Sequence, residues 1–162
     1  MRTLGTVLAV AGAVLLAGCG ATSIDTAKAE RFIKATVAGQ VGAKVKSVGC
    51  PSGKTAKKGA TFTCTVTGAD GTKGDALVTE RDNKGNVHVS APFVHPREIE
   101  ASIAAGLSKK VHARVRLSCP EIIVARTGGK FNCTAVDPKG QTGRIEAVQT
   151  DAKGHVTYTL AQ

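Results

Sequence analysis

Apolar residues recur along this chain first with a helical period of about four residues and then with a strand period of two. This order of segments occurs twice. Ala29, Ile33, Val37 and Val41 recur every four residues, which predicts an amphipathic helix ending near Gly42. Segments with a period of two follow, bounded by Gly-containing turns, and these predict half-buried antiparallel strands. In the first half they cover 45–48, 61–67, the residues around Ala76 and Val78, and 87–91.

The second half repeats this order almost residue for residue. Adding 70 carries the helical stripe onto Ile99, Ile103, Leu107 and Val111, and adding 69 carries the cysteine pair of the first half onto that of the second. We therefore predict an α+β fold of two tandem modules, each one helix packed on an antiparallel sheet of three or four strands. The predicted inward side chains are Ile33, Val37, Val41, Phe62, Val66, Val78, Val87 and Val89, then Ile103, Leu107, Val111, Phe131, Ala135, Ile145, Val156 and Tyr158.

The first residues have the marks of an exported precursor. Met1-Arg2 precedes an apolar run, and Leu16-Ala17-Gly18-Cys19 resembles the bacterial lipobox, in which the cysteine receives a diacylglyceryl group. The alternatives are an uncleaved signal anchor and an ordinary signal peptide with a chance cysteine. With the lipobox, residues 1–18 are the signal peptide, and Cys19 anchors the mature protein on the extracytoplasmic face of the cell membrane.

The domain organisation follows from these patterns. A lipidated N-terminus and short tether at 19–23 lead into the first repeat, 24–91. A linker with two prolines, 92–96, precedes the second repeat, 97–162. Proline restricts the backbone, so we expect a stiff connector and a limited range of orientations between the modules.

Four further cysteines predict two disulfides. Three pairings are possible, but a duplicated module must carry its own bond, so we expect Cys50–Cys64 and Cys119–Cys133. Each bond closes a loop of about 15 residues, which contributes roughly 3 kcal/mol in the chain-entropy model. A module of about 70 residues needs such support because one small core rarely supplies more than about 3–5 kcal/mol.

Each half carries Cys-Pro, a Lys- or Gly-containing loop, Gly-x-x-Phe-x-Cys and a later Asp-x-x-Gly turn. This pattern resembles the actinobacterial envelope domain called domain-of-unknown-function family 4333, over 27–89 and again over 99–158. The second loop departs from the first by having Arg126-Thr127-Gly128 in place of Lys57-Lys58-Gly59. The resemblance implies small secreted or lipid-anchored domains with one disulfide each and no assigned activity.

Charge suggests the class of partner. The net charge is +10, and it falls to +9 without residues 1–18, where Arg2 is the only charged residue. A basic exported surface favours anionic lipid headgroups or cell-wall polymers, with Lys54, Lys57 and Lys58 in the first disulfide loop as candidate contacts. The alternative is a solvated loop. Nucleic acid is excluded as a partner because the chain is exported, has no Trp and only one Tyr, and shows no binding motif.

Catalytic and metal motifs are missing from the sequence. His88, His95, His112 and His155 stand at no ligand spacing with cysteines or carboxylates, so we expect surface histidines, no metal and no cofactor. The matched pair Asp82 and Asp151 is typical of turn residues. We therefore expect a non-catalytic, lipid-anchored envelope protein that binds an envelope component, although the sequence identifies no protein partner. The alternative is a carrier of a small apolar or lipid ligand.

Overall fold

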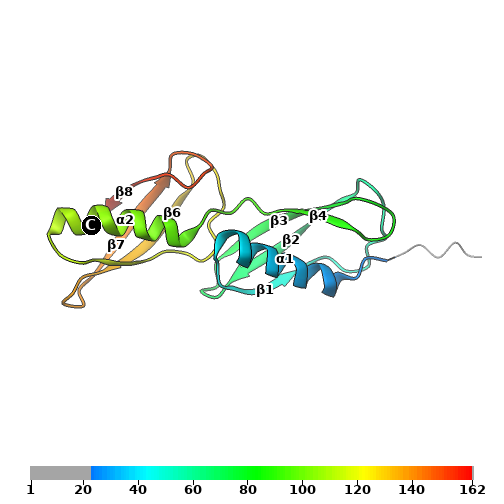
Figure 1. Ribbon diagram of the computed structural model, residues 1–162, viewed down its shortest axis with the longest axis horizontal. Helices are drawn as coiled ribbons and strands as arrows, with labels where there is room; N and C mark the ends of the chain where they lie inside the picture. Colours follow the sequence, from blue (N-terminus) through cyan, green and yellow to red (C-terminus); the bar gives the residue numbers. More distant parts are fainter. Residues whose placement is uncertain (1–22, 162) are drawn as a thin grey trace, which may run out of the picture.

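The computed structural model describes residues 23–161 and contains two modules with the same order of elements (Figure 1). Each module has one helix followed by four strands in an antiparallel sheet, with strand orders β1-β2-β3-β4 and β5-β6-β7-β8. The two-repeat α+β prediction is confirmed. The elements are α1 (Thr26–Val41), β1 (Val45–Gly49), β2 (Thr61–Gly68), β3 (Lys73–Glu80), β4 (Val87–Ser90), α2 (Pro96–Val111), β5 (Arg116–Ser118), β6 (Lys130–Val136), β7 (Thr142–Gln149) and β8 (Val156–Leu160).

Local signals fix both ends of α1. The Asp25 carboxylate accepts a hydrogen bond from the Lys28 backbone N–H at 2.9 Å, which satisfies one of the free donors of the first turn. Gly42 ends the helix with a φ of 63°, a left-handed conformation that glycine adopts without steric cost. The helix α2 begins at Pro96 and ends at His112, which adopts the left-handed conformation without being glycine.

Each helix covers one face of its sheet, and the core lies between them. In the first module, Ile33 and Val37 from α1 are fully buried against Cys64, Val66 and other inward residues of the sheet. Strands β2 and β3 pair so that inward residues stand opposite one another, as Phe62 does with Val78. The second core is built in the same way, around Ile103, Cys133, Ile145 and Ala147.

Both predicted disulfides are confirmed, with Cα–Cα distances of 4.3 Å for Cys50–Cys64 and 4.2 Å for Cys119–Cys133. In each module, a glutamate of the helix accepts a hydrogen bond from the first cysteine of the disulfide. Glu30 accepts the Cys50 N–H at 3.0 Å, and Glu100 accepts the Cys119 N–H at 2.8 Å. The two glutamates are 70 residues apart, so this hydrogen bond is a feature of the repeated module.

One predicted inward residue is wrong. Val111 is 54% exposed, whereas Val41, which occupies the same position in the first module, is only 6% exposed. The helical stripe is therefore complete in both copies but is covered along its whole length only in the first. The reason lies in how the two modules meet.

Candidate functional site

The loop after Cys119 in the second module docks on the β2–β3 hairpin of the first. The Glu121 N–H donates to Asp70 Oδ2 at 3.0 Å, and the Ile122 N–H donates to Thr72 Oγ1 at 3.1 Å. The Lys44 N–H donates to the Glu121 carboxylate at 2.9 Å. These three bonds form the polar part of what we call the junction.

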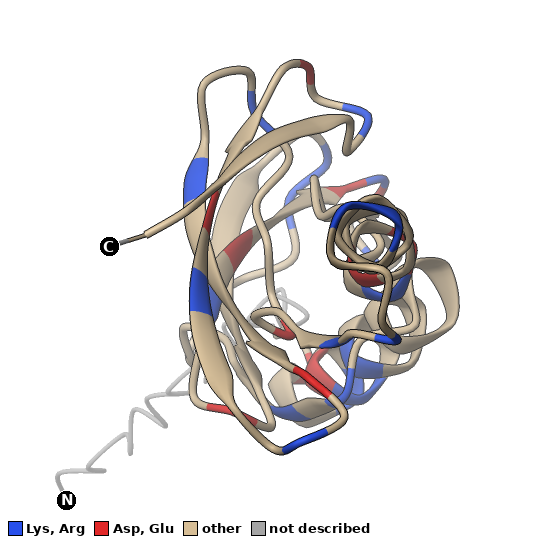
Figure 2. Ribbon diagram, turned by 90° about the vertical axis from the view of Figure 1, so that its left-hand side faces the viewer, with Lys and Arg blue, Asp and Glu red and all other residues tan. Residues whose placement is uncertain are grey.

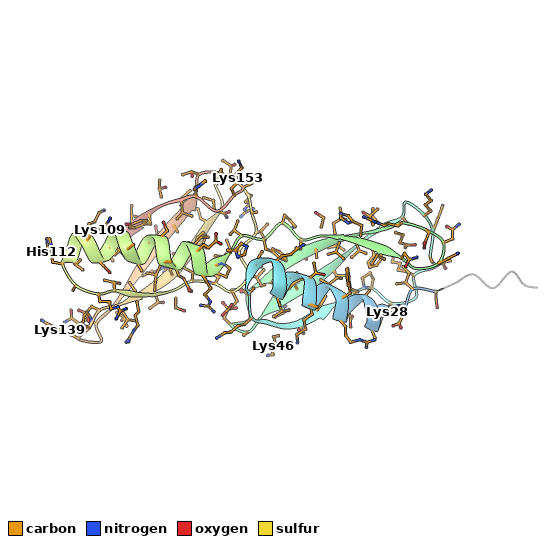
Figure 3. The ribbon with its side chains drawn as sticks, viewed as in Figure 1. Lys28, Lys46, Lys109, His112, Lys139 and Lys153 are labelled. Carbon is orange, nitrogen blue, oxygen red and sulfur yellow. A yellow bond between two sulfur atoms is a disulfide. The ribbon has the colours of Figure 1, made fainter. Side chains whose placement is uncertain are left out.

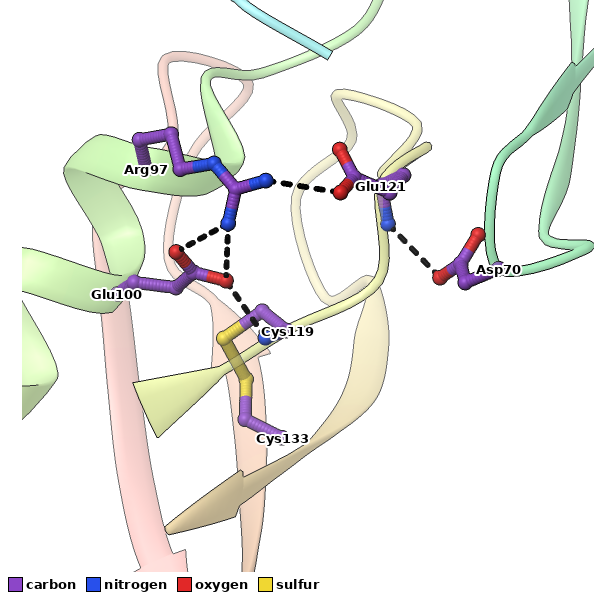
Figure 4. Close-up of a disulfide and its surroundings, with 6 residues drawn as sticks. All are labelled: Asp70, Arg97, Glu100, Cys119, Glu121 and Cys133. Carbon is purple, nitrogen blue, oxygen red and sulfur yellow. Dashed lines mark hydrogen bonds and ion pairs between the residues drawn. A yellow bond between two sulfur atoms is a disulfide. The ribbon is translucent and has the colours of Figure 1, made fainter. Parts of the chain in front are cut away.

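Arg97 pairs with Glu121 of the junction and with Glu100, which accepts a hydrogen bond from the second disulfide's Cys119 (Figure 4). Its guanidinium lies 2.9 Å from the Glu100 carboxylate and 2.8 Å from that of Glu121, and these carboxylates raise the pKa of Arg97. Glu100 also holds the Cys119 N–H. At Asp70, burial opposes ionisation, but the hydrogen bonds from Thr72 and the Glu121 N–H outweigh it and lower the pKa of the carboxyl.

Two apolar side chains form the remainder of the junction. Phe93 and Ile122 are 8% and 5% exposed and belong to the first module's core, although Ile122 lies in the second module's loop. Gly74 provides the space, because a Cβ there would lie 2.6 Å from Phe93 Cε1 and 2.8 Å from Ile122 Cγ2. Phe93 and Ile122 thus belong to the same core cluster as Val41, and they cover the end of the first core where Gly74 lies.

The corresponding end of the second module is an open apolar groove of about 460 Å³. We call it the distal groove. It is bounded by the end of α2 and the β6–β7 hairpin, and Leu160 at its edge is 65% exposed. Of the residues that the structure describes, none fills it as Phe93 and Ile122 fill the first module. Its lining residues are Leu107, Val111, Ala113, Val115, Ala135, Asp137, Pro138, Lys139, Gln141, Thr142, Gly143, Ile145 and Leu160.

Both signs of charge occur at the distal groove: Asp137 and Lys139 line it, and Lys109 and Lys110 lie in the last turn of α2. Lys109, Lys110 and Lys139 occupy the positions of Gly39, Gln40 and Asp70 in the first module. Figure 3 shows Lys109 and Lys139 at the end of the molecule away from α1. Figure 2 views the molecule from this end, with α2 on one side, the second sheet on the other, and Lys and Arg positions on both.

The opposite end of the molecule carries the lysines predicted as polyanion contacts. Ser23 forms an antiparallel bridge with Thr55, and the Ile24 N–H donates to the Lys54 carbonyl at 2.9 Å. The first disulfide loop therefore lies beside the point where the chain enters the first module. Its lysines are exposed, and the loop is held by Glu80 and Asn83, which accept the backbone N–H groups of Lys57 and Lys58.

The structure places the remaining predicted residues as follows. Over 23–161, no cluster of three or more His, Cys, Asp or Glu residues is placed to hold a metal ion. Asp82 and Asp151 each accept a turn N–H at 2.8 Å, as expected of turn residues. Asp151 also lies 2.5 Å from the His155 ring, and this hydrogen bond lowers the pKa of Asp151 to about 2.

Cys19 and the signal segment lie outside the described residues, so lipidation stays a prediction. None of the described helices is long and apolar enough to cross a membrane. Sequence reasoning missed the distal groove, because the helical stripe predicts Val111 as buried and nothing in the pattern shows which end of a module is covered.

The comparison with known families agrees with the resemblance over the first module. Residues 8–85 match the model of a family described as Domain of unknown function (DUF4333). No solved structure matches the chain. The structural equivalence of the two modules therefore rests on their shared elements and disulfides, and the family of the second copy stays a prediction.

Proposed function

We propose that this protein is a non-catalytic, lipid-anchored protein of the cell envelope that binds an envelope component through its distal groove. The observation that carries the proposal is the difference between equivalent ends. Phe93 and Ile122 bury the end of the first core, while Val111 and Leu160 remain exposed at the end of the second.

The size and chemistry of the distal groove support a binding role. Its volume of about 460 Å³ falls in the range of roughly 300–1,000 Å³ that is usual for ligand sites. Single exposed apolar residues are normal on a protein surface, but an apolar groove rimmed by polar groups is typical of an interaction site. Lys139 in the lining and Lys109 and Lys110 in the last turn of α2 would favour negative charge, with Asp137 as the one acidic residue of the lining.

The opposite end suits the membrane side of an anchored protein. Ser23, which bridges to Thr55, is the fourth residue after Cys19, so the anchor would lie at most about 14 Å from the first module. Lys54, Lys57 and Lys58 would then face the bilayer, where each cation near an anionic surface contributes about 1 kcal/mol. The distal groove would point away from the membrane.

Two experiments on oxidised residues 20–162 test these roles separately. Sedimentation with envelope fractions should lose the groove-dependent component in Leu160→Glu but not in Leu77→Glu, a control with 46% exposure on the first sheet. Equal binding by both variants would refute the role of the groove. Binding to anionic vesicles should fall between about 50 and 200 mM salt and should weaken when Lys54, Lys57 and Lys58 are changed to Gln.

A carrier of a small apolar or lipid ligand is the second candidate, because the distal groove is large enough for part of an acyl chain. Mass spectrometry under native conditions distinguishes the two. A lipid that co-purifies with residues 20–162, and is lost in Leu160→Glu, would favour the carrier.

A further inference from the structure

The junction inside this chain is a template for what the distal groove binds. The first module's end accepts an aromatic side chain, Phe93, and a branched aliphatic one, Ile122, beside the acidic Glu121. The groove preserves the apolar features of this site. Gly143 stands where Gly74 makes room, and Val111, Ala113 and Ala135 stand where Val41, Ala43 and Val66 line the first module's end. The polar rim of the groove differs, because Lys139 and Gln141 stand where Asp70 and Thr72 accept the backbone N–H groups of the docking loop.

We infer that the distal groove binds a segment of another protein that presents an aromatic or branched aliphatic side chain next to acidic residues. This inference rests on the proposed function and names the occupant of the same site. The apolar part of the specificity follows from the internal template. The acidic part follows from Lys109, Lys110 and Lys139, which replace two neutral residues and one acidic residue of the first module. Asp137 in place of Gly68 and Thr142 in place of Lys73 offset part of this gain in positive charge.

A second copy of this chain does not present the required side chains. Its first module has Ser23 and Gly53 where the second module has Phe93 and Ile122. Gly53 also has a φ of 70°, which a branched side chain disfavours. Its own Phe93 and Ile122 are buried in the junction. Head-to-tail association of identical chains is therefore not the expected use of the groove.

The chain supplies both a probe and its matched control. The probe is a fluorescent, disulfide-closed peptide of residues 119–133, which carries Glu121 and Ile122. The control is the peptide of residues 50–64, which has the same length and disulfide but Ser52 and Gly53 at those positions. The receptor is oxidised residues 20–162, observed by amide chemical shifts and fluorescence anisotropy.

We expect the 119–133 peptide to bind and to shift the resonances of Val111 and Leu160, while the 50–64 peptide does not. Leu160→Glu in the receptor should weaken binding at least about tenfold, equivalent to about 1.4 kcal/mol, whereas Leu77→Glu should not. Changing Arg126 and Lys130 of the peptide to Glu should strengthen binding on the order of threefold at about 50 mM salt, and less at about 200 mM.

If the free peptide does not keep the conformation that the loop has in the protein, a folded protein can serve as the probe. Residues 22–24 and 51–59 of a second chain are replaced by residues 92–94 and 120–128, which keeps the loop length and the disulfide. Sedimentation velocity should show that this graft associates with the wild-type chain but not with Leu160→Glu. If neither the peptide nor the graft binds, the inference is overturned.

Dodecyl phosphate tests the lipid alternative. If it occupies the groove while peptide and graft do not, the occupant is an anionic amphiphile and the inference is overturned. The proposed function then still stands if envelope binding remains sensitive to Leu160→Glu. If envelope binding is insensitive to that change, the proposed function itself has failed, whatever the peptide does.

Discussion

The substitution Gly74→Ala tests directly whether the junction is closely packed and the distal groove is open. An added Cβ would lie 2.6 Å from Phe93 Cε1 and 2.8 Å from Ile122 Cγ2. Favourable carbon contacts lie at about 3.5–4.0 Å, so one side chain must move by roughly 1 Å. Neither can move freely, because both are buried and Ile122 is β-branched. Such overpacking costs about 1–3 kcal/mol, while removing a strand glycine returns about 0.5–1 kcal/mol.

The net expectation is that Gly74→Ala lowers the free energy of unfolding by about 1–2 kcal/mol. Gly143→Ala is the matched control at the same repeat position. Its Cβ meets only Leu160 Cδ1, at 3.3 Å, and that side chain is exposed and can move into solvent. We therefore expect Gly143→Ala to be neutral or stabilising by up to about 1 kcal/mol.

Urea denaturation of the oxidised protein, followed by circular dichroism, measures both changes, and hydrogen exchange at the Glu121 amide reports on the junction itself. Protection of that amide should fall in Gly74→Ala and stay unchanged in Gly143→Ala. Equal destabilisation by the two substitutions, or an unchanged Glu121 amide in Gly74→Ala, would refute the packing argument.

Three further outcomes are expected. Replacing Cys119 and Cys133 by Ser should cost roughly 3 kcal/mol in denaturation, and no loss would contradict the loop-closure account. Glu100→Ala leaves the Cys119 N–H without its partner and should cost about 1–3 kcal/mol, with Glu98→Ala, on the exposed face, as the control. Asp70 has a lowered pKa, so its ionised form stabilises the junction above the unfolded-state pKa near 4, and this stability is lost as the pH falls through the lower folded-state value. The effect of Asp70→Asn on the protection of the Glu121 amide should therefore be present at pH 7 and disappear in acid; an effect independent of pH would contradict it.

Much of each module was predictable because local patterns and tertiary packing agree. The period of four from Ala29 to Val41 matches the buried face of α1, and the period of two around Phe62 matches β2. The duplication decided the disulfide pairing, since each copy must close its own loop. Gly42 marks the end of α1 through the left-handed conformation that glycine allows.

The junction and the groove were not predictable from those patterns. Periodicity identifies the face of an element that is buried but not the neighbour that buries it, so Val41 and Val111 look alike in the sequence. Val41 is 6% exposed and shares its core cluster with Ile122, from a loop far along the chain, whereas Val111 is 54% exposed. Two differences between the copies could have indicated the junction. Ile122 in place of Gly53 and Phe93 in place of Ser23 make the start and the disulfide loop of the second module more apolar than those of the first.

The unequal ends of the two modules support our proposal that the distal groove is a binding surface. Stacked repeats stay soluble when the outer faces of the stack are polar. The entry face of the first module meets this condition only in part: Ser23 and Gly53 replace the apolar pair that the second module uses for docking, but Phe32 near Ser23 is 52% exposed. The distal groove does not meet it, since Val111 and Leu160 are apolar and exposed, with the charged residues Asp137 and Lys139 beside them. A polar residue at either position would cost little folding energy, because both are already exposed to solvent. The proposed ligand, an apolar side chain next to acidic residues, would explain why exposed apolar side chains and lysines occur together at this end.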